Sequence, residues 1–234
     1  MHIVSYNIQA TINSRNYLAY SYEWPRQFLP LPSKKKTREQ IAAYLNRFDV
    51  ACLQEIDLGG LRNAFQNHAE QFDALTDFKY YTTQTNRRIS KLSLHGNMIL
   101  SKKPFEVVLD CALPGKVSGR GVLAVLVEDL VIANVHLSLG TADQQHQLHF
   151  INEQLRSYEQ VILCGDFNCT PQSAPLKAMQ ARGWRLLGNG SATFPAWQPK
   201  KALDHALYKG TLNASSHVSR FNQSDHLPII ITIN

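Results

Sequence analysis

The chain has 234 residues, which suits one large α/β core better than two independent ones, so we expect a single domain over residues 1–234. Apolar residues make up 44% of the chain and charged residues 18%, a balance that excludes a disordered protein. The formal net charge of +6 favours an anionic partner, such as a phosphoester, a nucleic acid or an acidic membrane surface. No apolar run reaches the roughly 18 residues that a membrane span needs.

The N-terminal residues and the number of cysteines indicate the cellular compartment in which the protein works. Residues 1–5 have the pattern of a strand, so we expect no signal peptide. The 4 cysteines are too few for a disulfide scaffold, and they lack the paired spacing of a zinc site. We therefore expect reduced thiols and a cytoplasmic protein, with a periplasmic location as the alternative.

The predicted elements mix strands and helices along the whole chain. Runs rich in β-branched residues predict strands at 3–8, 50–53, 97–100, 122–127, 131–135, 161–164, 202–208 and 229–233. A capping-box pattern at Thr37–Gln40 predicts the start of a helix, and helical spacing predicts others at about 60–75, 142–157 and 173–182. Such a mixture predicts an α/β sandwich.

Residues 13–36 form the most unusual segment, with clustered Tyr and Trp followed by prolines and by Lys34, Lys35 and Lys36. We predict a long loop, in which the part from Arg15 to Lys36 forms a lip beside the site, because it closely follows Asn7. Its rings and lysines favour an amphiphilic substrate and a peripheral membrane contact. Folding back over a sheet edge and stacking on nucleotide bases are the alternatives.

Polar side chains stand at the ends of the predicted strands in six places. They are Asn7, Glu55, His136, Asp166 with Asn168, Asp204 with His205, and Asp225 with His226. A buried carboxylate or imidazole is costly unless it is paired or bound to an ion. Six independent accidents explain the pattern less economically than one shared pocket, so we expect a single site.

The donor types at that site favour one chemistry. Glu55, Asn7 and Asp225 offer the oxygen ligands that Mg²⁺ or Mn²⁺ prefers over those of zinc. Such an ion completes its shell with water and substrate phosphate, which predicts metal-assisted hydrolysis of a phosphoester. His226 and Asp204 are the expected base and its orienting carboxylate.

Taken together, the motifs resemble those of the endonuclease/exonuclease/phosphatase superfamily, which includes deoxyribonuclease-I-like nucleases, neutral sphingomyelinases and inositol-phosphate phosphatases. The motifs, in chain order, are Ser5-Tyr6-Asn7, Leu53-Gln54-Glu55, Gly96-Asn97-Met98-Ile99-Leu100-Ser101, Asn134-Val135-His136-Leu137, Gly165-Asp166-Phe167-Asn168, Leu203-Asp204-His205 and Ser224-Asp225-His226-Leu227-Pro228. The resemblance runs nearly from end to end. It implies a four-layer α/β/β/α sandwich, with two packed mixed sheets flanked by helices.

The resemblance also implies roles. Glu55 and Asp225 would bind the metal, and Asn7 would position the scissile phosphate beside it. His226 would activate water and Asp204 would hold its tautomer, although some accounts make the residue at Asp166 the base. Asp166 and Asn168 would orient the nucleophile and the phosphate. His136 would stabilise the developing charge or protonate the leaving group.

The segment around His136 distinguishes branches of the superfamily. Abasic-site endonucleases carry an Asn-x-Tyr-x-Pro-Asn motif there, whereas this chain has Asn134-Val135-His136-Leu137-Ser138, so an abasic-site repair role is not expected. The element Thr193-Phe194-Pro195 is similar to one in small bacterial members, some associated with phospholipid metabolism. We therefore expect a small diester or phospholipid substrate, with a non-specific nuclease acting on DNA or RNA as the alternative. A binding module without activity is disfavoured because the expected catalytic residues are present.

Other polar residues allow two interpretations. Arg120, between Gly119 and Gly121, is a candidate phosphate ligand, although its glycines equally suit a tight hairpin. Asn97 is a candidate partner of His136 or of the phosphate. Arg87 and Arg88 are interpreted as a solvated loop, and the glutamines and histidines of 144–149 as a solvated helix face.

Overall fold

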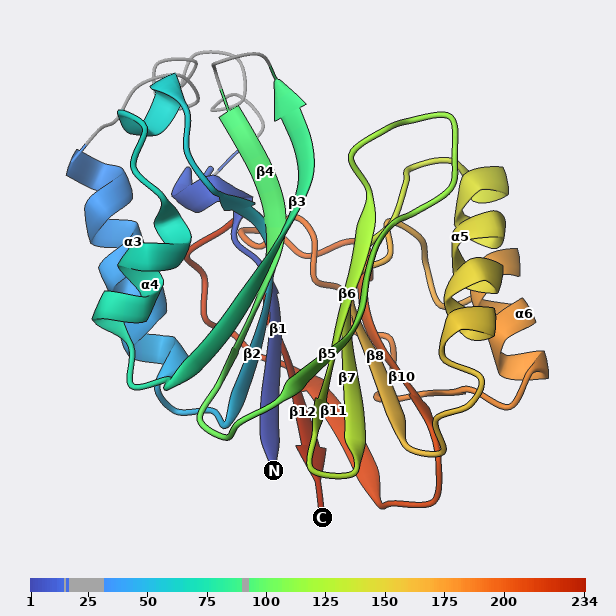
Figure 1. Cartoon of the computed structure of the whole chain (residues 1–234). Coiled ribbons are helices and arrows are strands. Elements are labelled where there is room, and N and C mark those ends of the chain that lie inside the picture. Colours follow the sequence, from blue (N-terminus) through green and yellow to red (C-terminus); the bar gives the residue numbers. More distant parts are fainter. Residues whose placement is uncertain (15, 17–31, 90–92) are drawn as a thin grey trace.

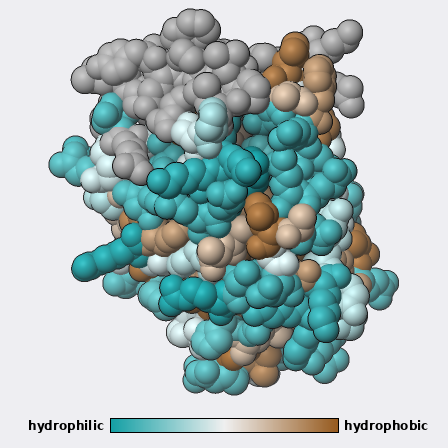
Figure 2. All heavy atoms as spheres, turned by 90° about the vertical axis from the view of Figure 1, so that its left-hand side faces the viewer, coloured by the Kyte–Doolittle hydropathy of each residue, from teal (hydrophilic) through white to brown (hydrophobic). Residues whose placement is uncertain are grey.

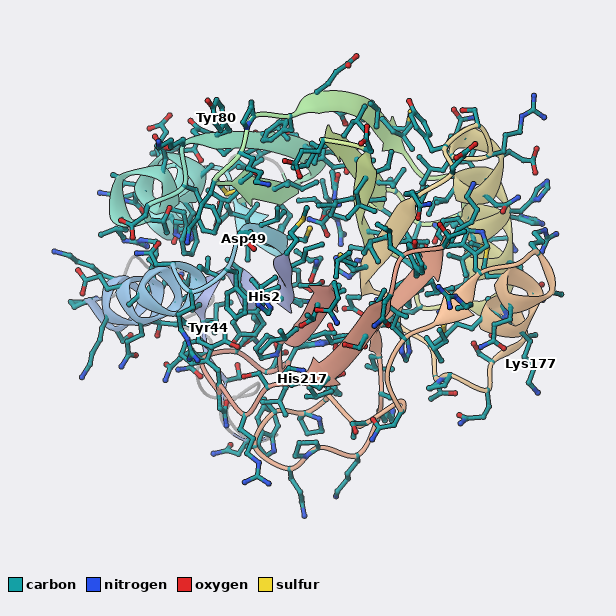
Figure 3. All side chains as sticks on the ribbon, turned by 90° about the horizontal axis from the view of Figure 1, so that it is seen from below. His2, Tyr44, Asp49, Tyr80, Lys177 and His217 are labelled. Atoms are coloured by element: carbon teal, nitrogen blue, oxygen red, sulfur yellow. The ribbon has the colours of Figure 1, made fainter. Side chains whose placement is uncertain are left out.

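The computed structural model describes residues 1–14, 16, 32–89 and 93–234. Two six-stranded sheets lie face to face, with helices on their outer sides (Figure 1). The view from below in Figure 3 shows the same layers, with Tyr44 and Lys177 on the helices at opposite sides of the molecule. The predicted α/β/β/α sandwich of mixed sheets is confirmed.

The first sheet contains the N-terminal and C-terminal strands, in the order β11-β12-β1-β2-β4-β3. Its strands are β1 (His2–Asn7), β2 (Val50–Asp57), β3 (Tyr80–Ile89), β4 (Ser93–Ser101), β11 (Ala214–Val218) and β12 (Ile229–Ile233). Strands β1 and β2 run parallel, and the other neighbours run antiparallel. The helices α3 (Pro32–Leu45) and α4 (His68–Leu75) cover its outer face. Figure 2, seen from this side, shows a mostly hydrophilic surface, as expected of the solvent-facing side of such a layer.

The second sheet has the order β5-β6-β7-β8-β10-β9. Its strands are β5 (Glu106–Ala112), β6 (Gly121–Val127), β7 (Leu130–His136), β8 (Val161–Asp166), β9 (Arg185–Leu186) and β10 (Asp204–Lys209). Strands β7 and β8 are its parallel pair. The helices α5 (Thr141–Gln154) and α6 (Ala174–Ala181) cover its outer face.

Strand β7 shows why the core needs continuous apolar runs. Val131, Ala133 and Val135 point to the cluster beneath α5 and α6. Leu130 and Ile132 point the opposite way, into the cluster between the two sheets. Because both faces are covered, side chains on both sides of the strand are buried, and its residues from Leu130 to Val135 are apolar except for Asn134.

Two predicted helices differ from those observed. The first begins at Pro32, so Thr37 lies inside α3 and does not cap it. Proline is favoured in the first turn of a helix, where its missing N–H is not needed. The second splits into a 3-10 turn at Leu61–Asn63 and α4, which Asn67 caps by accepting a hydrogen bond from the amide of Ala69 at 2.9 Å.

Strands β3, β5, β9 and β11 were not predicted. All four are the edge strands of the two sheets, where one side of the strand has no neighbour, so they lack the apolar runs of the central strands. Arg87 and Arg88 both lie on β3, which corrects their interpretation as loop residues.

The segment from Arg15 to Lys36 falls mostly outside the described residues, at 15 and 17–31. Its described end corrects the loop prediction, because residues 32–36 are the first turns of α3 and Lys34 is buried there. Among the described residues, no helix is long and apolar enough to cross a membrane.

Candidate active site

Strand register places three of the predicted side chains in one row. The parallel pairing of β7 with β8 sets His136 beside Asp166, and the antiparallel pairing of β8 with β10 sets Asp166 beside Asp204. All three lie where their strands begin or end, on the same side of the second sheet, and they are nearly buried. Asp166 is therefore the central residue of the row.

The first sheet supplies Asn7 and Glu55 to the same place. Asn7 ends β1, and its Nδ2 lies 3.3 Å from Glu55 Oε1 and 3.1 Å from Asp166 Oδ2, so it donates toward one carboxylate from each sheet. Its Oδ1 accepts a hydrogen bond from the Gln9 amide at 3.1 Å. Asn7 thus holds the two carboxylates together.

Glu55 lies at an irregularity of β2. The register with β4 shifts between Leu53 and Ile56, and Glu55 has a φ of 55°. A bulge of this kind bends the strand and re-aims a side chain. The Glu55 side chain is 32% exposed, whereas that of Asp166 is 3% exposed, so Glu55 is the carboxylate that faces an open space.

His226 and Asp204 form a buried dyad. His226 Nδ1 lies 2.8 Å from Asp204 Oδ2, and His226 Nε2 lies 3.9 Å from Asp166 Oδ2. The Phe194 ring lies tilted against the imidazole, with 4.9 Å between ring centroids. The ring is thereby fixed with Nε2 facing the carboxylates of the site.

Thr193 supports the dyad and was not predicted to do so. Its hydroxyl donates to Asp204 Oδ2 and accepts from the amides of Leu203 and Asp204 at 3.2 and 3.3 Å. Thr193 is fully buried. The sequence had drawn attention to Thr193-Phe194-Pro195 only as a resemblance, because its 11-residue separation from Asp204 gives no local signal.

Arg120 contacts His136 Nε2 through its guanidinium. Gly121 lies beside His136 in the register of β6 and β7, which puts Arg120 at the site edge of the sheet. His136 Nε2 also lies 3.5 Å from Asp166 Oδ2 and 4.0 Å from Glu55 Oε1. Arg120 and His136 therefore face the carboxylates from one side.

Three predicted residues have partners that give them supporting positions. The Asn168 amide N–H donates to Asp166 Oδ1 at 2.9 Å, and its Nδ2 donates to the Leu137 carbonyl at 3.0 Å. Asn97 Nδ2 donates to Gln84 and to the Gly121 carbonyl, both at 3.2 Å, so it joins β4 to β6. His205 Nε2 lies 2.7 Å from the Cys169 carbonyl, on the side away from Asp204 in the strand alternation. Phosphate contacts of Asn168 and Asn97 stay predictions.

Two glutamines of α5 correct the prediction of a solvated face. Gln144 donates to the carbonyls of Ser138 and Asn168 at 2.8 and 3.0 Å. Gln147 accepts from the Ser138 amide at 2.9 Å. Both are buried, and with Leu148 and Ile151 they follow the helical spacing of a core stripe, which was the available signal. They hold the loops that follow His136 and Asp166.

Burial and crowding of like charges change the proton affinities of the carboxyl groups. Burial, with the nearby Asp225, raises the pKa of Glu55. Burial, with Asp204 and Glu55, raises the pKa of Asp166 to about 7. Both shifts express the cost of gathering carboxylates in a buried place, a cost that a bound cation would relieve.

The pKa values of His136 and His226 are shifted in opposite directions. Burial and the adjacent Arg120 hold the pKa of His136 well below its usual value, which keeps it neutral. Burial also lowers the pKa of His226, but Asp204 and Asp166 outweigh it and the pKa lies well above its usual value. The site thus separates a neutral imidazole beside Arg120 from a basic imidazole beside Asp204.

The family model of the endonuclease/exonuclease/phosphatase family matches residues 4–226, which include every residue placed in the site. The chain belongs to this family. Its members are hydrolases that act on phosphoester bonds. No curated protein matches the chain in sequence.

Solved structures share the fold at low sequence identity. An endonuclease/exonuclease/phosphatase from Beutenbergia cavernae superposes with a TM-score of 0.81 at 16% identity, covering 100% of this chain and 71% of that one. The mannosyl-6-phosphatase Bt3783 of Bacteroides thetaiotaomicron has a TM-score of 0.70 at 14% identity, covering 100% and 99%. Truncated TDP2 of Caenorhabditis elegans has a TM-score of 0.65 at 16% identity, covering 99% and 96%.

Proposed function

We propose that the chain is a divalent-metal-dependent phosphoesterase in which His226 activates the attacking water. The observation that carries the proposal is the dyad: Asp204 fixes His226 Nδ1 at 2.8 Å and leaves Nε2 facing Asp166 and the remaining carboxylates. An imidazole held in this way is oriented to take a proton at Nε2.

The acidic residues fit a hard divalent cation. Glu55, Asp225 and Asp166 offer carboxylate oxygens, and burial together with neighbouring carboxylates raises the pKa values of Glu55 and Asp166, a cost that a cation would relieve. We assign the ion, Mg²⁺ or Mn²⁺, to Glu55 and Asp225, with Asn7 holding Glu55 in place. When bound, such an ion polarises a phosphoryl oxygen and neutralises developing charge.

Asp166, Asp204 and His226 also lie close enough together to hold a metal, but their hydrogen bonds favour a catalytic dyad at that place. Donor atoms of Asp166, Asp204 and His226 lie within 4.8 Å of one another. However, Asp204 and His226 Nδ1 already bind each other, and Asp204 also accepts from Thr193. These bonds occupy His226 Nδ1 and Asp204 Oδ2, so a metal at this place would take His226 Nε2, the nitrogen that the dyad leaves as its proton acceptor.

The remaining residues divide the other tasks. Asn168 caps Asp166 through its amide, and Asn7 donates to the other oxygen, so the Asp166 carboxylate is held to receive or orient the nucleophile. Asp166, with a pKa of about 7, is the alternative base. Arg120 carries the positive charge for the phosphate, and neutral His136 accepts from its guanidinium at Nε2 and so holds Arg120 in place beside the carboxylates.

The substrate class is a phosphodiester or a phosphomonoester. The mannosyl-6-phosphatase named above supports a monoester, and the net charge of +6 supports a nuclease as the second candidate. A phospholipid-type substrate and a peripheral membrane contact rest on residues 15–36, of which Lys35 and Lys36 are described and exposed on α3.

A substrate panel with each metal tests the proposal. The panel contains a chromogenic diester, a sugar phosphate, phospholipid vesicles and single-stranded DNA. We expect hydrolysis of at least one ester that requires His226 and Glu55. Metal-dependent turnover that survives in both His226→Ala and Glu55→Gln would overturn the proposal. A rate on DNA that falls steeply with salt, with none on the small esters, would favour the nuclease.

A further inference from the structure

A cavity of about 130 Å³ adjoins the site on its Arg120 side. Glu55 and His136 line one part of it, and Arg87, His95 and Arg120 line the rest. Its walls come from both sheets, namely the β3–β4 hairpin of the first and the segment before β6 of the second. The cavity therefore extends the site beyond the residues that act on the scissile phosphate.

Arg87 is held at this cavity by the shape of β3. The pairing of β3 with β4 shifts register between Thr85 and Arg87, and Arg87 then faces His95 across the hairpin. Such a shift re-aims the side chains that follow it. Asn86, the extra residue, also lines the cavity, and its Oδ1 is shielded from solvent without a hydrogen-bond partner in the described part of the chain.

Gly119 permits the close approach of the second wall. A Cβ at this position would lie 2.6 Å from Arg87 Cβ and 2.9 Å from its Cγ, so only glycine lets the two segments pack. Gly119 also has a φ of +92°, which disfavours other residues. The stem of Arg87 is thus fixed against the segment that carries Arg120.

The charges at the cavity point to an anion. Burial lowers the pKa of Arg120, Glu55 and Asp166 act against that shift, and Arg87 lies near enough that its charge lowers the pKa further. Two guanidinium groups on facing walls of one cavity repel each other, and an anion between them would remove that cost. Arginine also matches the oxygen geometry of phosphate through its planar fork.

We propose that Arg87 and Arg120 form a subsite for a second phosphate group of the substrate, an inference that rests on the proposed function. Arg120 contacts His136 and so belongs to the scissile phosphate as well, whereas Arg87 lies on the far flank and its side chain is exposed to an arriving ligand. The substrate is then an ester with two phosphates. The second phosphate belongs either to a small phosphorylated ester or to the next link of a nucleic acid.

A matched pair of substrates tests the subsite. Both are p-nitrophenyl esters of a thymidine nucleotide, and one carries a second phosphate on its sugar. For Arg87→Gln we expect KM for the two-phosphate ester to rise at least about fivefold, with kcat and the one-phosphate ester changed less than about twofold. Arg87→Lys should recover part of the loss, because it keeps the charge without the fork. Arg156→Gln, at an exposed arginine after α5, is the control and should change neither substrate.

Two further measurements separate the outcomes. A loss in Arg87→Gln on a short single-stranded oligonucleotide, but not on the two-phosphate nucleotide, assigns the second phosphate to a nucleic acid. Calorimetric binding of inorganic pyrophosphate and orthophosphate needs no turnover, so it tests the subsite even if the proposed function fails. Pyrophosphate binding should weaken in Arg87→Gln while orthophosphate binding is retained. Equal effects on both ligands, or no effect on pyrophosphate, would overturn the subsite.

Discussion

Asp204 Oδ2 accepts hydrogen bonds from two side chains, the His226 imidazole at 2.8 Å and the buried hydroxyl of Thr193. One oxygen therefore links the imidazole to a segment that otherwise lies outside the sheet. When the imidazole is neutral, the arrangement places its proton on Nδ1 and leaves Nε2 as the acceptor, and the raised pKa of His226 means that this form is favoured only as the pH rises above that pKa. The predictions below follow from this geometry and from the carboxylates that face it.

The dyad should act as one unit. We expect His226→Ala and Asp204→Ala each to lower kcat by at least about a hundredfold, and the double variant to lose little more than the worse single one. Steady-state kinetics on a chromogenic diester measure this, with His146→Ala on the exposed side of α5 as the control. Losses that multiply would show that the two residues act separately.

Thr193 should be a positioning residue. Thr193→Val removes the donor to Asp204 and the acceptor of two amides, so we expect kcat to fall about tenfold with little change in KM. Thr193→Ser should restore most of the rate because it keeps the hydroxyl. The exposed Thr211→Val is the control. A rise in KM at unchanged kcat would contradict the assignment.

The stability of the packing between the two sheets should depend on the buried side-chain amide of Asn134, beneath the site. Asn134 donates to the carbonyls of Leu53 and Met98 at 2.9 and 3.0 Å and accepts from Gln54 at 2.7 Å. Asn134→Ala removes the donor to both carbonyls and one of the three acceptors of Gln54 Nε2, so we expect a loss of at least about 2 kcal/mol in the free energy of unfolding. Urea denaturation measures it, with the exposed Asn213→Ala for comparison. An unchanged midpoint would show that the inter-sheet bonds contribute little.

Sequence reasoning located most of the site because its donors interrupt or end apolar strands. Asn7, His136, Asp166 and Asp204 each stand at a strand end, where a polar side chain is conspicuous. Register then brings them together, and register is not readable from one strand alone. The roles assigned to these residues stay predictions.

The supporting residues were hidden for a different reason. Thr193 lies 11 residues from Asp204, and the partners of Gln144 and Gln147 lie outside α5, so the core spacing of the two glutamines marks them as buried but not as supports of the site. The edge strand β3 was also missed, because its sequence is mostly polar and lacks the apolar run of a buried strand. The start of α3 was placed too late because the capping-box pattern outweighed Pro32.

Glu55 should be necessary for binding the cation. Mg²⁺ or Mn²⁺ at about a hundredfold excess over its Kd should add about 2.7 kcal/mol to the stability of the wild type, and much less to Glu55→Gln. Thermal unfolding with and without metal measures this independently of activity. Glu39→Gln, an exposed carboxylate on α3, should keep the full metal response. An equal response in Glu55→Gln would place the ion elsewhere.

The most direct test of the account is the hydrolysis of a chromogenic phosphodiester by the chelated protein, before and after a divalent cation is restored. Burial, together with Asp225, raises the pKa of Glu55, and burial, together with Asp204 and Glu55, raises the pKa of Asp166, which is the arrangement expected of a cation site. We predict that exhaustive chelation abolishes turnover and that Mg²⁺ or Mn²⁺ restores it in the wild type but not in His226→Ala. Full turnover after chelation would contradict the account.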